Sequence, residues 1–358
     1  MKPTKALNDL GQSLWIDDIT RDMLDRGTLK KYIDEFSVTG LTSNPTIFDN
    51  AISKSASYDD EVKRLFKAGY SGEALFFELA LQDLSRAADM FLPTHERTAS
   101  VDGYVSLEVS PLLAYDTRAT VASAKRLFER AHKPNLFIKI PGTKEGLPAI
   151  EEAIYSGVSV NVTLLFSSEH CVKAADAYMK GLERRVAEGL SPDARSVASI
   201  FVSRWDKAVL DKVPAELKDK LGIAVSHQSY RDYRKLLDSD RWQRLESMGA
   251  RPQRLLFAST STKDPAAPDT LYVEALAAPN TVNTMPDKTL LSFGDHGKLD
   301  GVLSPDGGDC EDVLAAFEKA GISVSGLAAQ LQKEGAASFV KSWEDLLQSI
   351  ETKSKALG

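Results

Sequence analysis

Residues 133–167 read KPNLFIKIPGTKEGLPAIEEAIYSGVSVNVTLLFS and contain two apolar runs. The first run, residues 136–140, ends in Pro141-Gly142, a pattern typical of a buried parallel strand. It carries one lysine, Lys139. Because burying an ammonium group is costly, a core lysine generally has a task, and its amine can attack a carbonyl to form a Schiff base. A lysine that snorkels to water at a strand end gives the same pattern, and this segment alone does not separate the two.

The second apolar run, residues 158–166, alternates in its middle. Successive side chains of a strand point to opposite faces, so Asn161 and Thr163 share one face. In a surface sheet this pattern would mean only that one face meets water. In a strand covered on both sides, two polar side chains need partners, which indicates a site.

Composition bounds the class of protein. The chain has 358 residues, 43% hydrophobic and 27% charged, which fits a globular protein with a large core. Its start, MKPTKALNDLGQSLW, lacks the apolar centre of a secretion signal, and no run of 18 apolar residues occurs. Cys171 and Cys310 fit no metal pattern and suit a reducing compartment. We therefore expect a cytoplasmic protein with no membrane span and no metal site.

The net charge of −7 argues against a general nucleic-acid binder. A small anionic substrate would therefore need cationic side chains gathered locally around it.

Strand patterns alternate with amphipathic helical patterns along the chain, which implies parallel pairing. Eight such units predict an α/β fold, a single (β/α)8 barrel domain spanning residues 1–358. A doubly wound open sheet is the alternative, but no G-x-G-x-x-G follows the first strand. The expected strands are residues 13–17, 38–42, 104–109, 136–140, 159–166, 197–202, 254–259 and 281–284.

Two helical additions to the barrel are expected. Residues 45–103 are too long for one helix and contain helical patterns at 58–67 and 73–90, an inserted pair after the second strand; residues 92–103 are expected to form an exposed polar loop. Residues 335–356 form a C-terminal helix whose apolar stripe would pack on the barrel. The sequence leaves open whether the chain is a monomer or a homodimer.

Polar side chains lie at or near the carboxyl ends of seven predicted strands. In a barrel these ends converge on one face, where barrel enzymes build their sites. One such residue is unremarkable, but one on each of seven strands is hard to explain by chance. The set is Asp17, Asn44, Glu108, Lys139, Asn161, Thr163, Ser199, Arg204, Ser259 and Lys263, with the apolar Phe201 among them on the sixth strand.

Five ordered motifs resemble those of the transaldolases, and the match runs from about Leu14 to the C-terminal helix. Residues 40–48 (GLTSNPTIF) resemble the first signature of that family, and residues 136–147, around Lys139, its Schiff-base signature. Residues 158–167, 199–204 and 280–286 match as well.

The resemblance implies a class I aldolase that moves a dihydroxyacetone unit between sugar phosphates in the non-oxidative pentose phosphate pathway. The donor would be fructose 6-phosphate or sedoheptulose 7-phosphate, and the acceptor erythrose 4-phosphate or glyceraldehyde 3-phosphate. Lys139 would form the Schiff base, Asp17 would exchange the proton of the C4 hydroxyl, and Glu108 with Thr163 would hold a proton-shuttling water. No metal or organic cofactor is implied, because the protonated imine is itself the electron sink.

The resemblance also implies substrate-binding residues. Asn44, Asn161 and Ser199 would bind donor hydroxyls, and Phe201 would form a pocket wall.

Arg204 and Ser259 match phosphate-binding residues of the family. Some members have an arginine where this chain has Ser261; Lys263 is the natural substitute, although it binds as a point charge. Arg254 lies at the opposite end of its strand and is not a candidate.

Structural alternatives stand beside these roles. Asp17 or Asp18 could cap a helix, and strand parity does not say which faces the barrel; the resemblance favours Asp17. Glu108 could pair structurally with Arg118, and Asn44 could shape a turn or cap a helix.

Two rival functions remain. One is a fructose 6-phosphate aldolase that releases dihydroxyacetone; small relatives with that activity have glutamine at the position of Glu108. The other is a catalytically silent barrel that serves as a binding scaffold.

Overall fold

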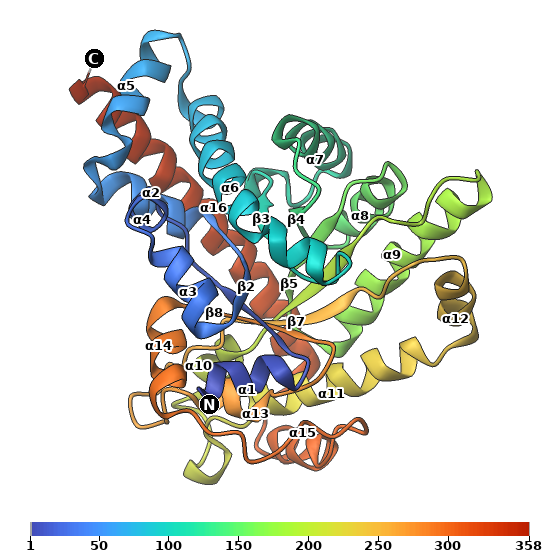
Figure 1. The fold of residues 1–358 in the computed structure, drawn as a ribbon. Coiled ribbons are helices and arrows are strands. Elements are labelled where there is room, and N and C mark those ends of the chain that lie inside the picture. Colours follow the sequence, from blue (N-terminus) through green and yellow to red (C-terminus); the bar gives the residue numbers. More distant parts are fainter. Residues whose placement is uncertain (1, 358) are drawn as a thin grey trace.

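The eight predicted strands form one closed, all-parallel barrel in the computed structural model, which describes residues 2–357 (Figure 1). Each strand pairs with its sequence neighbours, and β1 closes the barrel on β8. The predicted (β/α)8 architecture is confirmed, with strand ends within two residues of those expected. The strands are β1 Ser13–Ile16, β2 Val38–Leu41, β3 Val105–Glu108, β4 Leu136–Pro141, β5 Val160–Leu165, β6 Ser196–Phe201, β7 Arg254–Ala258 and β8 Val282–Met285.

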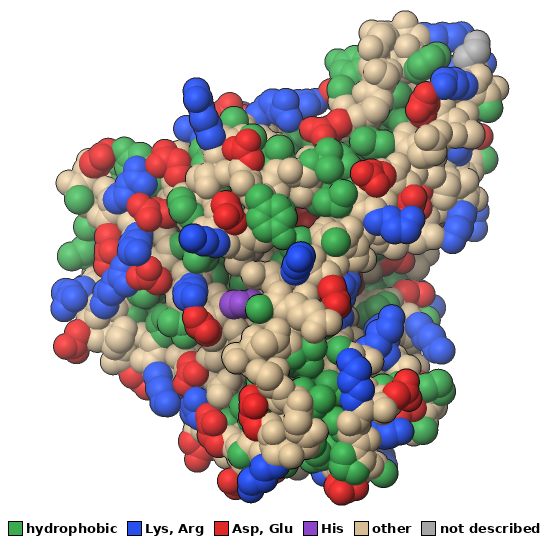
Figure 2. All heavy atoms as spheres, turned by 180° about the vertical axis from the view of Figure 1, so that it is seen from behind, with side chains coloured by type: hydrophobic (Ala, Val, Ile, Leu, Met, Phe, Trp, Pro, Cys, Tyr) green, Lys and Arg blue, Asp and Glu red, His purple; other side chains and the backbone are tan. Residues whose placement is uncertain are grey.

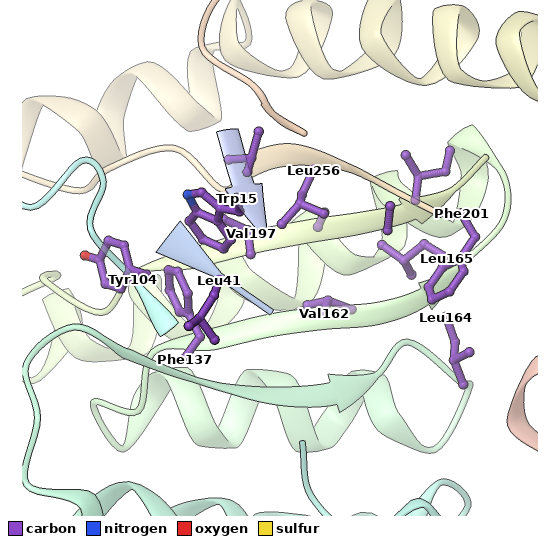
Figure 3. Close-up of a cluster of buried hydrophobic side chains, with 14 of the residues drawn as sticks. Trp15, Leu41, Tyr104, Phe137, Val162, Leu164, Leu165, Val197, Phe201 and Leu256 are labelled. Carbon is purple, nitrogen blue, oxygen red and sulfur yellow. The ribbon is translucent and has the colours of Figure 1, made fainter. Parts of the chain in front are cut away.

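Side chains fill the interior of the barrel. Figure 3 shows Trp15, Tyr104 and Phe137 gathered toward one end of the strands, and Leu165 with Phe201 toward the other. The rings of Tyr104 and Phe137 stack with centroids 4.2 Å apart. The barrel is thus a packed core whose ends differ: aromatic packing closes the amino end and polar groups occupy the carboxyl end.

Strand register brings the polar residues together. Glu108 on β3 pairs with Lys139 on β4, and Lys139 pairs in turn with Asn161 on β5. Two residues further along the same strands, Pro141 pairs with Thr163. Neighbouring strands lie about 4.8 Å apart, so this register fixes the side chains as close neighbours before any loop contributes.

Helices surround the barrel and cover its strands (Figure 1). Their apolar faces pack on the strands, which leaves each strand buried on both sides, as the continuous apolar runs predict. Within residues 2–357 they are α1 Pro3–Asp9, α2 Arg21–Asp25, α3 Thr28–Phe36, α4 Pro45–Lys54, α5 Asp59–Lys67, α6 Gly72–Arg97, α7 Thr117–Ala131, α8 Gly146–Tyr155, α9 Ser168–Ala187, α10 Ser203–Val209, α11 Leu221–Leu237, α12 Asp240–Ser247, α13 Leu271–Ala275, α14 Asp287–His296, α15 Cys310–Lys319 and α16 Val324–Leu357.

The segment after β2 contains α4 as well as the two expected helices, which are α5 and α6. The expectation of an exposed loop over residues 92–103 is wrong. Helix α6 continues to Arg97, and Asp102 is buried, because its carboxylate accepts hydrogen bonds from Trp15 Nε1 at 2.8 Å and from the Ser13 hydroxyl. Buried partners therefore satisfy a carboxylate that composition assigns to solvent.

Helix α16 packs on the barrel as predicted, but it begins at Val324, upstream of the expected start. Gln332 donates hydrogen bonds to the carbonyls of Gly142 and Leu164, at 3.1 and 3.0 Å, on the carboxyl rim of the barrel. A side chain added to Gly335 would come within 3.0 Å of Leu164, so glycine permits this close approach. Figure 1 shows α16 running on alongside α4, α5 and α6, with which it is in contact.

No helix within residues 2–357 is long and apolar enough to cross a membrane. Acidic and basic side chains are interspersed over the face shown in Figure 2.

Candidate active site

A cavity of about 290 Å³ opens among the carboxyl ends of the barrel strands. Most of the predicted site residues line it, although they come from six different strands or the segments that follow them. Those lining the cavity are Asp17, Asn44, Lys139, Thr163, Ser199, Phe201, Arg204, Ser259 and Lys263.

Glu108 does not line the cavity but lies beside Lys139, which does. Its Oε2 is 3.1 Å from Lys139 Nζ, and the two side chains are only 4% and 7% exposed. Lys139 Nζ also donates a hydrogen bond to the Ser43 carbonyl at 3.0 Å. The alternative of a snorkelling lysine is therefore wrong, and Glu108 pairs with Lys139 rather than with Arg118, which lies on α7. Burial raises the pKa of Glu108, and the charge of Lys139 opposes that rise.

Asn161 lies beneath Ser199 and is fully buried. Its Oδ1 accepts a hydrogen bond from the Ser199 hydroxyl at 2.7 Å, and its Nδ2 donates to Ser106 Oγ at 3.2 Å. The polar face of β5 thus points into the barrel and finds partners on β3 and β6. By contrast, Thr163 Oγ1 and Glu108 Oε1 are buried without a hydrogen-bond partner among residues 2–357.

Asp17 follows β1 directly and faces the cavity. Its Oδ1 accepts a hydrogen bond from the Thr42 hydroxyl at 2.7 Å, and that hydroxyl is also 2.7 Å from the hydroxyl of Thr284. Burial raises the pKa of Asp17, while Lys139, the Thr42 hydrogen bond and Lys263 oppose the rise. Burial, together with the charge of Asp17, raises the pKa of the next residue, Asp18, to about 6. Of the two, only Asp17 lines the cavity.

Asn44 serves as the N-cap of α4 and also lines the cavity. Its Oδ1 accepts a hydrogen bond from the backbone N–H of Ile47 at 3.1 Å. Because the cap fixes the side chain, its amide nitrogen is held at the cavity wall. Asn44 can therefore cap the helix and still bind a substrate hydroxyl, so these two predicted roles are compatible.

The outer end of the cavity is cationic. Arg204 stands in the first turn of α10, and Lys263 Nζ donates a hydrogen bond to Ser261 Oγ at 2.6 Å. Within the described chain, neither cation has a carboxylate within 4.0 Å. Burial, Lys207 and Arg204 lower the pKa of Lys263. Ser259, at φ 57°, has the left-handed conformation, with its hydroxyl 2.9 Å from that of Ser203.

Sequence reasoning missed several residues that line the cavity. Thr42 holds Asp17, and Thr284 is hydrogen-bonded to Thr42. The same strand-end pattern that found the others could have found both, because they lie near the ends of β2 and β8. Thr46 and Asn50 come from α4, and Phe339 from α16. No strand pattern could assign these three, because only tertiary packing brings their helices to the rim.

The arrangement has a clear chemical capacity. A buried amine, Lys139, is flanked by one carboxyl group and faces another, Asp17, across a cavity with a cationic outer end. An amine of this kind can attack a carbonyl, the carboxyl groups can exchange protons, and the cations can bind a phosphate. No group of three or more His, Cys, Asp or Glu side chains in the described chain is arranged to hold a metal ion.

The sequence of the chain is similar to those of known proteins. A sequence model of the family described as "Transaldolase/Fructose-6-phosphate aldolase" matches residues 14–350. The chain is 44% identical to a protein named transaldolase from Arthrobacter sp. (strain FB24), over 98% of this chain and 96% of that protein. It is 44% identical to the transaldolase of Thermobifida fusca (strain YX), over 97% of each, and 43% identical to transaldolase 2 of Streptomyces coelicolor (strain ATCC BAA-471 / A3(2) / M145), over 99% and 97%.

Proposed function

Because the chain belongs to the transaldolase/fructose-6-phosphate aldolase family of enzymes, we propose that it transfers a dihydroxyacetone unit from a ketose phosphate to an aldose phosphate. The donor is fructose 6-phosphate or sedoheptulose 7-phosphate, and the acceptor is erythrose 4-phosphate or glyceraldehyde 3-phosphate, in the non-oxidative pentose phosphate pathway. The observation that carries the proposal is the buried Lys139–Glu108 pair, whose lysine lines a cavity with a cationic outer end.

Catalysis begins with attack of the Lys139 amine on the C2 carbonyl of the donor, and loss of water gives the iminium. Glu108 and Thr163 hold the water that moves protons in this step. The support is local: Glu108 Oε1 and Thr163 Oγ1 are buried beside Lys139 without a protein partner, and buried polar atoms are nearly always hydrogen-bonded.

Cleavage of the C3–C4 bond then requires loss of the C4 hydroxyl proton, which Asp17 accepts. Its raised pKa suits a group that must both take and return a proton. The electron pair left on C3 is delocalised into the iminium, so no metal or organic cofactor is needed.

Fixed side chains around the cavity bind the hydroxyl groups of the donor. Asn44 is held by its cap and Ser199 by its hydrogen bond to Asn161, so both groups lose little freedom when a sugar binds. Asn161 itself does not line the cavity and would act through Ser199. Phe201 forms the wall beside them.

The phosphate binds at the outer end, to Arg204, Ser259 and Lys263. Arg204 is half-buried and Lys263 is exposed, and neither has a carboxylate partner within residues 2–357. Both charges are therefore available to an anion, which supports this assignment. Ser261 occupies the position where some family members have arginine, and its hydroxyl holds Lys263 instead.

Borohydride trapping tests the mechanism directly. The protein is incubated with fructose 6-phosphate, reduced, digested and mapped by mass spectrometry, with Lys139→Met as the matched control. A three-carbon adduct on Lys139 is expected in the wild type alone. No adduct, or one on another lysine, overturns the mechanism and favours a binding scaffold.

The same family also contains fructose-6-phosphate aldolases, which release dihydroxyacetone instead of transferring it. Adding erythrose 4-phosphate before the reduction separates the two, because transfer consumes the Schiff-base intermediate and yields sedoheptulose 7-phosphate. Replacement of Glu108 by Gln is expected to raise release relative to transfer. An unchanged ratio contradicts the role given to Glu108.

A further inference from the structure

Phe339 is a cavity residue that belongs to no barrel strand. It lies on α16, its side chain is 6% exposed, and it lines the cavity together with Lys139 and Arg204. Lys139 Nζ lies 6.0 Å from the centre of its ring, and Arg204 Cζ lies at the same distance. The ring therefore spans the interval between the reacting amine and the phosphate-binding cation.

A continuous apolar wall joins this ring to the barrel. Phe339 meets Phe201 edge to face, with centroids 6.4 Å apart, and Phe201 stacks on Phe166 at 5.3 Å. Arg204 lies over both Phe201 and Phe339, at 5.5 and 6.0 Å. Such contacts hold a guanidinium group in place without neutralising it.

The position of Phe339 is fixed from both sides along α16. Gln332 ties the helix to two carbonyls on the barrel rim, and Ser342 is hydrogen-bonded to Thr46 of α4 at 2.8 Å. Trp343, one turn beyond Phe339, packs edge to face on Phe76 of α6 with centroids 5.0 Å apart. The ring is thus held over the cavity by anchors before and after it.

We infer that Phe339 is a positioning residue that determines whether the three-carbon unit on Lys139 is transferred to an aldehyde or released by solvent. This inference rests on the proposed function. An apolar ring between Lys139 and the cavity mouth excludes water from the reactive carbon, and its negative face stabilises the positively charged iminium.

The two fates of the intermediate differ in one bond. In transfer, the electron pair on C3 forms a carbon–carbon bond with the aldehyde carbon, and the aldehyde oxygen takes the proton from Asp17. In release, C3 takes a proton that comes from solvent, and water then hydrolyses the iminium to dihydroxyacetone and free Lys139. Only the second fate needs solvent access to C3, which Phe339 restricts.

The test measures solvent protonation of C3 itself. Wild type, Phe339→Leu and Phe339→Ala are incubated with fructose 6-phosphate in D₂O without acceptor, and deuterated dihydroxyacetone is quantified by mass spectrometry. Its release is expected to rise several-fold in both variants, and the ratio of release to transfer is expected to rise when erythrose 4-phosphate is added. Phe339→Tyr keeps the ring and should remain close to wild type.

Leu346→Ala is the matched control, because Leu346 is a fully buried residue of the same helix that does not line the cavity. This variant should lower thermal stability and leave the ratio of dihydroxyacetone release to transfer unchanged. If Phe339→Leu still traps the adduct on Lys139 but releases no more deuterated product than wild type, the inference is wrong while the proposed function stands. If the wild type traps no adduct, the proposed function itself fails.

Discussion

Lys139 Nζ and Glu108 Oε2 lie 3.1 Å apart on adjacent strands that pair these two residues in register. The barrel itself thus sets their separation, and no loop has to close to bring them together. A buried charge is tolerated when it has a partner and is costly when it has none. The contact on which the proposed mechanism rests therefore also constrains stability.

Loss of either partner should destabilise the protein more than loss of both. Lys139→Met or Glu108→Gln alone is expected to lower the free energy of unfolding by about 3–5 kcal/mol, because an unpaired buried charge remains. The double variant should recover part of that loss, which urea unfolding of all four proteins will measure. Additive effects would contradict a coupled pair.

The stability of Lys139→Met should depend on pH with a defined sign. Without Lys139, the pKa of Glu108 rises further, because the lysine is the main group that opposes the effect of burial. The penalty is fully present above that raised pKa, where the carboxylate is ionised, and it is lost as pH falls from there to the pKa of an unfolded glutamate, 4.5. Urea unfolding at a series of pH values should show that the difference in free energy of unfolding between wild type and Lys139→Met becomes smaller as pH falls.

Thr42 is expected to set the acid limit of activity. Its hydrogen bond to Asp17 lowers the pKa of that carboxyl group against the effect of burial. Thr42→Val preserves shape and removes the bond, so the acid limb of kcat/KM should move to higher pH by about one unit. Thr46→Val, which changes a cavity threonine that does not touch Asp17, should leave the limb in place. If the acid limb of kcat/KM stays in place in Thr42→Val, the pKa of Asp17 does not determine that limb.

The cationic end of the cavity should select for phosphate. Lys263→Ala is expected to raise KM for fructose 6-phosphate about tenfold or more, the effect of one lost charged hydrogen bond, with little change for unphosphorylated fructose. Lys212→Ala, an exposed lysine near the end of α10 and outside the cavity, is the control. Equal losses with both sugars would mean that Lys263 acts on the protein and not on the phosphate.

Much of this fold could be predicted from sequence because its strands are covered on both sides. Short apolar runs separated by amphipathic stretches marked all eight strands, and polar residues at their ends pointed to one face. The site residues on or directly after strands, such as Lys139 and Thr163, were found in this way. Their spacing is set by register, which the sequence pattern carries.

The parts that could not be predicted depend on contacts between segments far apart in the chain. Phe339 reaches the cavity because α16 crosses the rim, and a helical stripe says only that one face is buried. The polar segment after Met90 resembled an exposed loop, whereas Asp102 finds partners on β1. Ser13 and Trp15, which supply those partners, lie nearly 90 residues upstream, and nothing local to Asp102 indicates them.

The final prediction separates the two ends of the barrel. Asp102 accepts hydrogen bonds from Trp15 and Ser13 near the amino end, and Arg254 donates to the same Ser13 hydroxyl at 2.7 Å. Asp102→Ala leaves the buried Trp15 N–H without a partner, so we expect the free energy of unfolding to fall by about 2–4 kcal/mol. Activity per folded molecule should be unchanged, because residues at this end of a barrel serve stability.

Asp193→Ala is the control, because it removes an exposed carboxylate paired with Arg195. It should lower the free energy of unfolding by less than about 1 kcal/mol in the same urea titration. A fall in kcat for Asp102→Ala at full folding would instead mean that the amino end of β1 controls the placement of Asp17.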